Sequence, residues 1–444
     1  MGTESMTIQC GNFIGGKWEQ GADGITRVNP ANIHDLVATA PDSSTEDARR
    51  AIQAAADAFG RWRQTIPPER GKIVLRAAQL LESKLEEVAR LLTREEGKIL
   101  SESQAEVKRA IDIMEYASGM GRRLGGQTLP TEVPNVFCFT TRQPIGPVAA
   151  ISPWNFPVAI PCWKIAPALV CGNTVVLKPS PLTSATATRV VEIFQEAGLP
   201  PGVLNLLHGG AQVGSELVNN PLIRGISFTG STKVGMAIHS AAARRLAKVQ
   251  LEMGGKNPQI ILRDADLKSA VECCVTAAFG STGQRCTATS RAIVERNVAQ
   301  EVAELLLEKT KAIRVGPGDH HEVTMGPLVD EARLRDVKGF VQRAREDGAE
   351  VLVGGCEPEG LRDGYYYAPT VVGNVRPEQE IAREEVFGPV LSFIEVNDLE
   401  EALKVANATE YGLCASIFTR DISRAFTFID RIEAGMIHVN RPGL

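Results

Sequence analysis

The loop Gly280–Ser290 contains the residues of the sequence that most directly suggest covalent chemistry. Cys286 lies there among small and hydroxyl residues, Arg285 precedes it, and Gly283 stands three positions earlier. A permanent positive charge beside a thiol favours the thiolate, which is the nucleophilic form, and glycine permits a positive φ or a close approach to a ligand. An isolated cysteine is more often a buried packing residue. The hypothesis of a nucleophile therefore depends on the other motifs of the chain.

Two motifs offer polar side chains that could assist such a nucleophile. Asn155, in the segment Pro-Trp-Asn-Phe-Pro, could donate its amide to a developing oxyanion or could bond the backbone of its own turn. Glu252, in the segment Leu-Glu-Met-Gly-Gly-Lys, is a candidate general base, although a glutamate before a turn is often a surface residue. Both interpretations stay open while each motif is taken alone.

Three more motifs complete the set. Lys178 and Ser180 lie at the end of an expected strand and could contact a ribose or a phosphate, although a lysine there is often solvated. In Phe-Thr-Gly-Ser, a strand leads into a helix whose free N–H groups near Gly230 and Ser231 would form an anion site. The acids at the start of Glu384–Pro389 precede a Phe-Gly-Pro turn and mean little by themselves.

The elements that must position these motifs form two alternating series of strands and helices. The first runs from residue 146 to about residue 230, and the second begins near residue 259. Such alternation predicts right-handed βαβ units and parallel sheets covered on both faces, with ligands at the carboxyl ends of the strands. We therefore predict an α/β fold with two doubly wound, Rossmann-like domains. Helices are expected over 158–170, 184–197, 211–219 and 267–279.

The N-terminal region is expected to be mostly helical after a short strand-and-turn entry. Ser44 or Thr45 can cap a first helix, a second helical stretch runs over 67–96, and a third over 101–120. Residues 122–147 break this pattern with glycines and prolines around an alternating segment. They predict either an exposed hairpin that serves as an interaction arm or an edge hairpin of the main sheet.

Composition limits the classes of function. The net charge of −5 without basic clusters argues against nucleic acid as a partner. No apolar run is long enough to span a membrane, and the first twenty residues have no signal pattern. Nine cysteines and six histidines show no metal-ligand spacing and no disulfide framework. We expect a protein of the reducing cytoplasm, with neither a metal nor a membrane partner.

Taken together and in order, five motifs make the chain resemble the aldehyde dehydrogenase superfamily along essentially its whole length. They are Pro-Trp-Asn-Phe-Pro, Phe-Thr-Gly-Ser, Leu-Glu-Met-Gly-Gly-Lys, Gly-Gln-Arg-Cys and Glu-Glu-Val-Phe-Gly-Pro. The resemblance implies an enzyme that oxidises an aldehyde to a carboxylate with NAD or NADP. It also implies an NAD(P)-binding domain over 1–123 and 147–254, a catalytic domain over 255–440, and an oligomerisation arm over 124–146.

The resemblance further implies roles for single residues. Cys286 would be the nucleophile, Glu252 the general base that activates water, and Asn155 the oxyanion donor together with the backbone N–H of Cys286. The thiolate would form a thiohemiacetal, hydride would pass to the nicotinamide, and water would hydrolyse the thioester; covalent catalysis thus divides one difficult oxidation into easier steps. The implied cofactor residues are Ser152, Trp154, Lys178, Ser180, Gly230, Ser231, Glu385 and Phe387.

The chain departs from the family pattern at two places. Pro181 stands where many NAD-preferring members have a glutamate that binds the ribose hydroxyls and repels a 2′-phosphate, so we expect NADP to be accepted. The sequence stops at Leu444, where relatives usually continue with a tail that helps to form the substrate tunnel and the oligomerisation sheet. We therefore expect a homodimer or homotetramer if that tail is present.

Arg285 bears on the choice of aldehyde. It resembles members that act on anionic aldehydes, because a guanidinium suits bidentate recognition of a carboxylate; an ion pair inside the protein is the alternative. The segments around Trp163 and Cys286 look most like bacterial 2-oxoglutarate semialdehyde (2,5-dioxopentanoate) dehydrogenases. Lys108, with Arg109 beside it, could add a cation at the tunnel mouth, and the resemblance makes Trp163 a further candidate substrate-binding residue.

Other functions stay open from the sequence. Succinate semialdehyde, glyceraldehyde 3-phosphate or a neutral aldehyde could be the substrate. A coenzyme-A-acylating dehydrogenase would share the fold and the cysteine, but the presence of Glu252 favours hydrolysis. A cofactor-binding protein without turnover would bind the nucleotide and form no NAD(P)H.

Overall fold

The alternation of strands and helices in the sequence produces two parallel sheets in the computed structural model, which describes residues 6–21 and 23–443. Residues 1–5 of the expected first domain and the chain end at Leu444 lie outside the described residues. The chain divides into two compact units. Unit 1 comprises the described part of residues 1–28 together with 35–96 and 100–252, and unit 2 comprises 29–34, 97–99 and the described part of 253–444.

The core of unit 1 is a sheet of seven strands. Five of them run parallel, and β2 and β3 extend the sheet as an antiparallel hairpin. In order across the sheet, the strands are β12 (Lys248–Glu252), β11 (Gly225–Thr229), β8 (Pro147–Ile151), β9 (Thr174–Lys178), β10 (Leu204–Leu206), β2 (Asn12–Ile14) and β3 (Lys17–Glu19).

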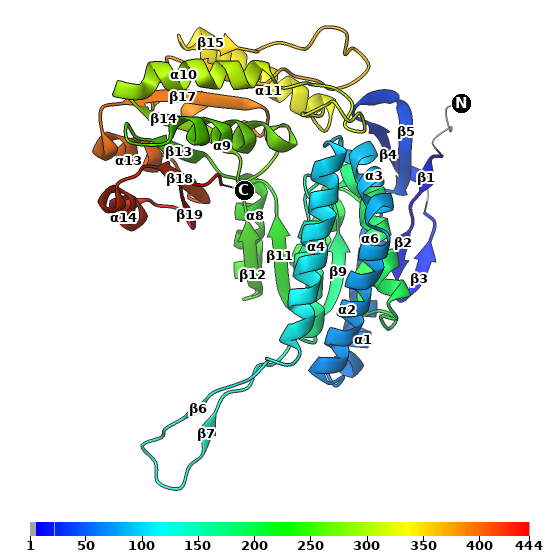
Figure 1. The fold of residues 1–444 in the computed structure, drawn as a ribbon. Coiled ribbons are helices and arrows are strands. Elements are labelled where there is room, and N and C mark those ends of the chain that lie inside the picture. The colour runs from blue at the N-terminus through cyan, green and yellow to red at the C-terminus, as the bar shows by residue number, and fades with distance from the viewer. Residues whose placement is uncertain (1–5, 22, 444) are drawn as a thin grey trace. The chain divides into compact units, whose positions relative to one another are not determined.

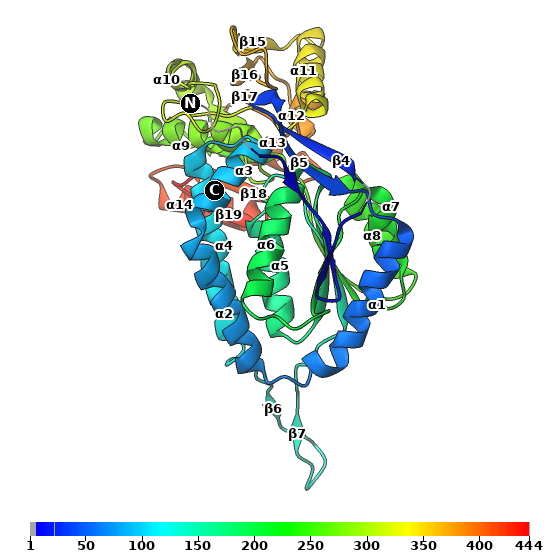
Figure 2. The ribbon, with the colours of Figure 1, turned by 90° about the vertical axis from the view of Figure 1, so that its right-hand side faces the viewer.

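Helices cover both faces of this sheet, as Figure 2 shows edge-on. One face carries α1 (Thr45–Trp62), α7 (Ala211–Asn219) and α8 (Thr232–Ala243). The other face carries α5 (Ala159–Val170) and α6 (Ser184–Glu196), and an outer layer packs on these two helices. The outer layer consists of α2 (Pro67–Ser83), α3 (Leu85–Glu96) and α4 (Leu100–Met120).

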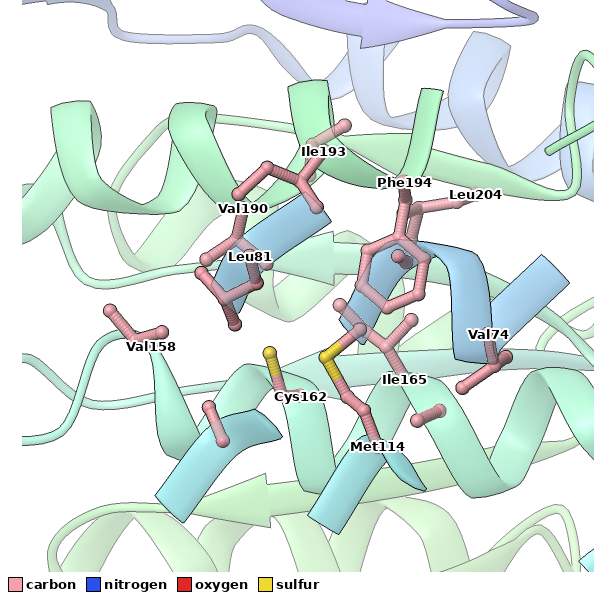
Figure 3. Close-up of a cluster of buried hydrophobic side chains, with 14 of the residues drawn as sticks. Val74, Leu81, Met114, Val158, Cys162, Ile165, Val190, Ile193, Phe194 and Leu204 are labelled. Atoms are coloured by element: carbon pink, nitrogen blue, oxygen red, sulfur yellow. The ribbon is translucent and has the colours of Figure 1, made fainter. Parts of the chain in front are cut away.

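The hydrophobic core under this second face is shown in Figure 3. Met114 of α4, Cys162 and Ile165 of α5, and Phe194 of α6 are all buried and belong to one cluster with strand residues such as Leu204. Because three helices and the sheet share this cluster, α4 is fixed against the helices that follow β8 and β9.

The interaction arm predicted at residues 122–147 projects away from the helices of unit 1 (Figure 1). Its two strands, β6 (Thr128–Leu129) and β7 (Cys138–Phe139), pair over only two residues each. Phe137 and Phe139 are exposed and their ring centroids are 5.6 Å apart. Such a short hairpin has little stability of its own.

Unit 2 is built around a second sheet of seven strands. All of its pairs are parallel except β15 with β16. The order is β15 (Glu350–Val353), β16 (Thr370–Gly373), β17 (Val390–Val396), β14 (Thr289–Glu295), β13 (Asn257–Ile261), β18 (Cys414–Phe418) and β19 (Met436–Val439).

Two separate apolar clusters lie on the two faces of this sheet. The helices of one face are α9 (Leu267–Phe279) and α10 (Arg296–Lys311); those of the other are α11 (Glu331–Glu346), α12 (Glu380–Arg383), α13 (Leu399–Asn407) and α14 (Ile422–Arg431). The two sheets confirm the predicted α/β fold with Rossmann-like parallel sheets. A small sheet of β1 (Ile8–Gln9), β5 (Asn32–Pro41) and β4 (Asp23–Asn29) completes the strands.

Several local expectations differ from the structure. The helical stretch expected over 67–96 is two helices, because Lys84 leaves the helical conformation at φ −110° and ψ 13°. Ser44 rather than Thr45 caps α1, and it forms a capping box with Asp47. The strand β12 was not expected; it is an edge strand whose residues are exposed or half-exposed, so it lacks the apolar run of a buried strand.

No helix of the described part of the chain combines the length and apolarity needed to cross a membrane.

Arg291 ties three segments of unit 2 together from the middle of the sheet. It lies on β14, is 1% exposed, and donates to the carbonyl of Lys256 at 3.0 and 2.7 Å. It also donates to the carbonyls of Val405 and Ala406 at the end of α13, at 2.9 and 2.8 Å. Burial lowers the pKa of Arg291 to about 10, and the guanidinium supplies donors that these carbonyls would otherwise lack.

We predict that Arg291→Met lowers the free energy of unfolding by about 3–5 kcal/mol, because it leaves buried carbonyls unpaired. Chemical denaturation measures the change. The matched control is Arg296→Met, since Arg296 reaches Glu395 only at 3.7 Å with both side chains more than half exposed, and it should cost less than about 1 kcal/mol. Equal losses in the two variants would contradict the role of Arg291.

Candidate active site

In unit 1, four strands bring their polar ends to one edge of the sheet. Strand pairing aligns Ile151 with Lys178 and Thr229 with Glu252, and β11 also pairs with β8. Ser152, which follows Ile151, donates its N–H to the carbonyl of Lys178 at 3.1 Å. The structure thus places several of the predicted cofactor and catalytic residues of this unit side by side at the carboxyl edge, where parallel sheets bind ligands.

The loop after β8 carries Trp154 and Asn155, and Asn155 is 4% exposed. The loop ends where α5 begins, and α5 has no side-chain cap of its own. Glu106 of α4 supplies the missing acceptor: its Oε1 accepts from the N–H groups of Val158 at 2.8 Å and Ala159 at 3.1 Å. The sequence did not identify Glu106 as a functional residue. Its only signal is that it is acidic and lies within the buried stripe of its helix.

Two hydroxyl groups at the same edge are buried without a hydrogen-bond partner among the described residues. They belong to Ser152, after β8, and to Thr229, at the end of β11. Buried polar groups are normally paired. Their presence at the carboxyl edge, next to Lys178, fits a polar ligand better than an apolar one.

Lys178 is almost fully buried, and its Nζ donates to the carbonyl of Pro179 at 2.9 Å. Burial lowers its pKa to about 8, while the nearby Asp42 carboxylate opposes the shift. The Ser180 hydroxyl accepts from the N–H of Leu182 at 3.3 Å. The predicted ribose residues are therefore held in a turn that leads directly into α6.

The helix α8 begins next to this edge with Ser231 as its N-cap, and the Ser231 side chain makes no capping hydrogen bond. The N–H groups of the first turn can therefore meet an anion, as a pyrophosphate site requires. The N–H of Gly230 is already used, because it donates to the carbonyl of Glu252 at 3.1 Å. Gly230 thus positions the helix start rather than offering its own N–H.

Glu252 is exposed at the end of β12. Its Oε1 accepts from Gln250 at 2.8 Å; Gln250 accepts in turn from Ser227 at 2.6 Å, and Ser227 from the Nζ of Lys164 at 2.9 Å. Burial lowers the pKa of Lys164 to about 8, and Glu252 opposes the shift. Lys164 escaped sequence reasoning, although it is the one charge in the apolar helix α5.

In unit 2, the Cys286 loop begins with a strained turn. Ser281, Thr282 and Gly283 have φ values of 50°, 57° and 67°, which are unusual for the two residues that carry a Cβ. Asn257 fixes the other side of the loop, since its Nδ2 donates to the carbonyl of Cys286 at 2.7 Å and to that of Ala288 at 2.9 Å. Asn257 looked like part of a loop in the sequence, but it begins β13.

Arg285 is half-buried and its Nη2 donates to the carbonyls of Thr276 at 3.2 Å and Ala277 at 2.8 Å, in the last turn of α9. The guanidinium therefore caps that helix, and this use competes with the predicted contact to substrate. Arg285, Glu385 and Phe387 line the same small cavity of ≈ 10 Å³ within unit 2.

The Glu385 carboxylate lies close to the backbone of Gly254 and Gly255. Its Oε1 accepts from the N–H of Gly255 at 2.9 Å, and a Cβ on Gly254 would lie 2.2 Å from its Oε2. Burial raises the pKa of Glu385 to about 7, with Lys256 opposing, while burial lowers the pKa of Lys256 to about 7. Phe387 follows in a turn with φ 52°.

The other predicted substrate residues lie on neighbouring helices of unit 1. Lys108 is exposed on α4, and Trp163 is 37% exposed on α5, which packs against α4.

Comparisons with known proteins agree on one family. A sequence model described as "Aldehyde dehydrogenase family" matches residues 18–443. The alpha-ketoglutaric semialdehyde dehydrogenase of Bacillus subtilis is 45% identical over 434 residues, which is 97% of this chain and 89% of that protein. The alpha-ketoglutarate semialdehyde dehydrogenase of Haloferax volcanii is 43% identical, covering 98% and 91%. A solved structure of an E. coli NADP-dependent enzyme superposes with a TM-score of 0.95 at 36% identity, covering 98% and 90%.

Gly283 approaches another backbone segment so closely that a side chain has no room. With φ at +67°, an added Cβ would lie 2.2 Å from the carbonyl oxygen of Gly388. We predict that Gly283→Ala lowers the free energy of unfolding by about 2–5 kcal/mol, from the backbone conformation and the overlap together. Chemical denaturation measures this loss.

Gly348→Ala is the matched control, because Gly348 has a similar φ of +86° with nothing within 4 Å of an added Cβ. Gly348→Ala should lower the free energy of unfolding only by the cost of placing a residue with a Cβ at positive φ, about 1–2 kcal/mol. If both variants lose the same stability, the close approach to Gly388 does not constrain this loop.

Proposed function

This chain belongs to the aldehyde dehydrogenase family and is an NAD(P)-dependent aldehyde-oxidising enzyme, and from that premise we propose that its substrate is the semialdehyde of 2-oxoglutarate. The observation that carries the proposal is the similarity, over 97% of the chain, to a relative named for this substrate at 45% identity. A second relative with a name of the same meaning, at 43% identity, supports it.

We propose that the reaction begins when the Cys286 thiolate attacks the aldehyde carbon. The oxyanion of the thiohemiacetal receives hydrogen bonds from the Asn155 amide and the backbone N–H of Cys286. The left-handed turn before Cys286 and the bonds from Asn257 support the role, since they fix the backbone on both sides of the thiol. Glu252 then removes a proton from the water that hydrolyses the thioester.

The edge residues of unit 1, together with Glu385 and Phe387 of unit 2, would hold the cofactor. When bound, the oxidised nicotinamide supplies the acceptor for the hydride that the thiohemiacetal gives up. Lys178 and Ser180 would bind the adenosine ribose, and the first turn of α8 after Ser231 the pyrophosphate. The unpaired hydroxyl of Ser152 supports a polar ligand there. Glu385, with Phe387 beside it, would bind the nicotinamide riboside through its carboxylate.

The division of labour between the units is part of the proposal. Unit 1, which includes residues 147–252 of the predicted cofactor range 147–254, would bind most of the cofactor. Unit 2 would provide the nucleophile and, through Glu385 and Phe387, the contacts to the nicotinamide riboside. The arm would join copies of the chain in a homo-oligomer, which its exposed Val136, Phe137 and Phe139 support. Nine free cysteines support a reducing, cytoplasmic location.

We predict that NAD(P)H forms faster with carboxylated semialdehydes of five carbons than with neutral or phosphorylated aldehydes, when kcat/KM is measured across such a panel. Cys286→Ser should abolish the reaction with every aldehyde, because the thiolate is lost.

Arg285→Ala should raise KM for the anionic aldehyde about tenfold or more and leave KM for a neutral aldehyde of equal length nearly unchanged. Equal effects on both aldehydes would mean that Arg285 only caps α9.

We predict that NADP is used with a kcat/KM within about 100-fold of that for NAD, a difference of about 2.7 kcal/mol at most. Pro181 is the first residue of the short helix η1 (Pro181–Thr183) and brings no carboxylate to the ribose. Pro181→Glu should reduce kcat/KM for NADP by about 10–100-fold relative to NAD, because a carboxylate repels the 2′-phosphate.

The neutral control is Pro181→Gln, which makes the same backbone change and should alter both cofactors alike. A native enzyme that prefers NAD by more than about 100-fold would contradict the prediction.

A further inference from the structure

We propose that Glu95 and Glu106, two buried glutamates of the outer helical layer, are positioning residues that hold the two functional loops of unit 1 independently of each other. Glu106 would hold the loop that carries Asn155, and Glu95 the turn that carries Lys178 and Ser180. The inference deepens the proposed function and rests on it for the roles of these loops.

Glu106 is 3% exposed and reaches from α4 to the first residues of α5. Its Oε1 accepts from the N–H of Val158 at 2.8 Å and from the N–H of Ala159 at 3.1 Å. Only Phe156 and Pro157 separate Asn155 from the first of these N–H groups. The position of the Asn155 amide therefore depends on where α5 starts, and Glu106 fixes that start.

Glu95 is fully buried and does the same for α6 from the last turn of α3. It uses both oxygens: Oε1 accepts from the N–H of Ala185 at 2.8 Å, and Oε2 accepts from the N–H and the hydroxyl of Thr186 at 2.8 and 2.5 Å. Arg27 fixes Glu95 in turn by donating to its backbone carbonyl at 2.8 and 2.6 Å.

Neither helix caps these groups with a side chain of its own N-cap residue. The N-caps of α5 and α6 are Val158 and Thr183, and neither makes a side-chain capping bond. The functional side chains Asn155 and Ser180 stand three residues before these two positions. The acceptors come instead from α3 and α4, which pack against α6 and α5 (Figure 2).

The two glutamates are expected to affect different constants. Loss of the Glu106 carboxylate displaces the oxyanion donor and lowers kcat. Loss of the Glu95 carboxylate displaces the ribose residues and raises the Kd of the cofactor. Glu106→Ala should lower kcat about 10–100-fold, since an oxyanion donor is worth about 10²–10³ in rate and a small displacement loses part of it. Glu95→Ala should raise the Kd of the cofactor about tenfold or more, with kcat retained at saturation.

Each variant has a conservative partner that keeps an accepting oxygen. Glu106→Gln keeps a carbonyl oxygen that can accept from the N–H groups of both Val158 and Ala159, so kcat should fall clearly less than in Glu106→Ala. Glu95→Gln loses one of two accepting oxygens and turns an amide N–H₂ toward the N–H of either Ala185 or Thr186. It should therefore weaken cofactor binding nearly as much as Glu95→Ala.

The decisive experiment is a double-mutant cycle of Glu106→Ala with Asn155→Ala, with kcat measured on the best aldehyde that the enzyme oxidises. If Glu106 acts through Asn155, adding Glu106→Ala to Asn155→Ala should change kcat by less than about twofold. The same fold loss in both backgrounds would overturn the proposal, because it would show a general structural effect. Asp398→Asn weakens the cap of α13, where Asp398 accepts from Glu401 at 3.0 Å, and should change neither constant.

The outcome does not depend on the identity of the substrate. If the enzyme oxidises another aldehyde better than the semialdehyde of 2-oxoglutarate, the proposed substrate fails and the cycle is still read on that other aldehyde. Cofactor titration tests Glu95 without turnover. Amide hydrogen exchange at Val158 and Ala159 tests Glu106 without turnover, since Glu106→Ala should speed their exchange in a folded protein. Unchanged exchange would overturn the role of Glu106.

Discussion

The buried N-terminal N–H groups of α5 and α6 are the constraint on which the functional edge of unit 1 depends. A parallel sheet places its functional loops directly before such helices, so each loop inherits the position of the helix that follows it. These N–H groups are out of reach of water and must be paired. Glu95 and Glu106 pair them from a different layer of the fold, so the helices furthest from the sheet set the geometry at its edge.

In unit 2, a glycine and one asparagine amide hold the residues of the proposed site in place. Glu385 approaches the backbone at Gly254 more closely than any side chain there would permit. Asn257, next in the chain after Lys256, bonds the carbonyl of Cys286. The short segment from Gly255 to Asn257 thus contacts both Glu385, the proposed nicotinamide riboside residue, and the loop of Cys286, the proposed nucleophile. About three residues of backbone connect these two parts of the proposed site.

Much of the fold could be predicted from the sequence because its signals are local. The helices over 211–219 and 267–279 begin and end where the apolar pattern and the flanking residues indicate. The break at Lys84 has no proline or glycine to mark it, and the exposed edge strand β12 has no apolar run. The site is a different case. Cys286, Asn155 and Glu252 are predicted from a family resemblance, whereas Lys164, Glu106 and Asn257 were missed because their contacts are with partners distant in the sequence.

The bonds that Asn257 makes have a chemical consequence for the lifetime of the protein. Asparagine side chains decay spontaneously when the nitrogen of the next residue attacks the amide and closes a five-membered ring. The next residue here is Pro258, whose nitrogen carries no hydrogen, so this route is closed. The amide that fixes the Cys286 loop is therefore protected by its neighbour from deamidation by this route.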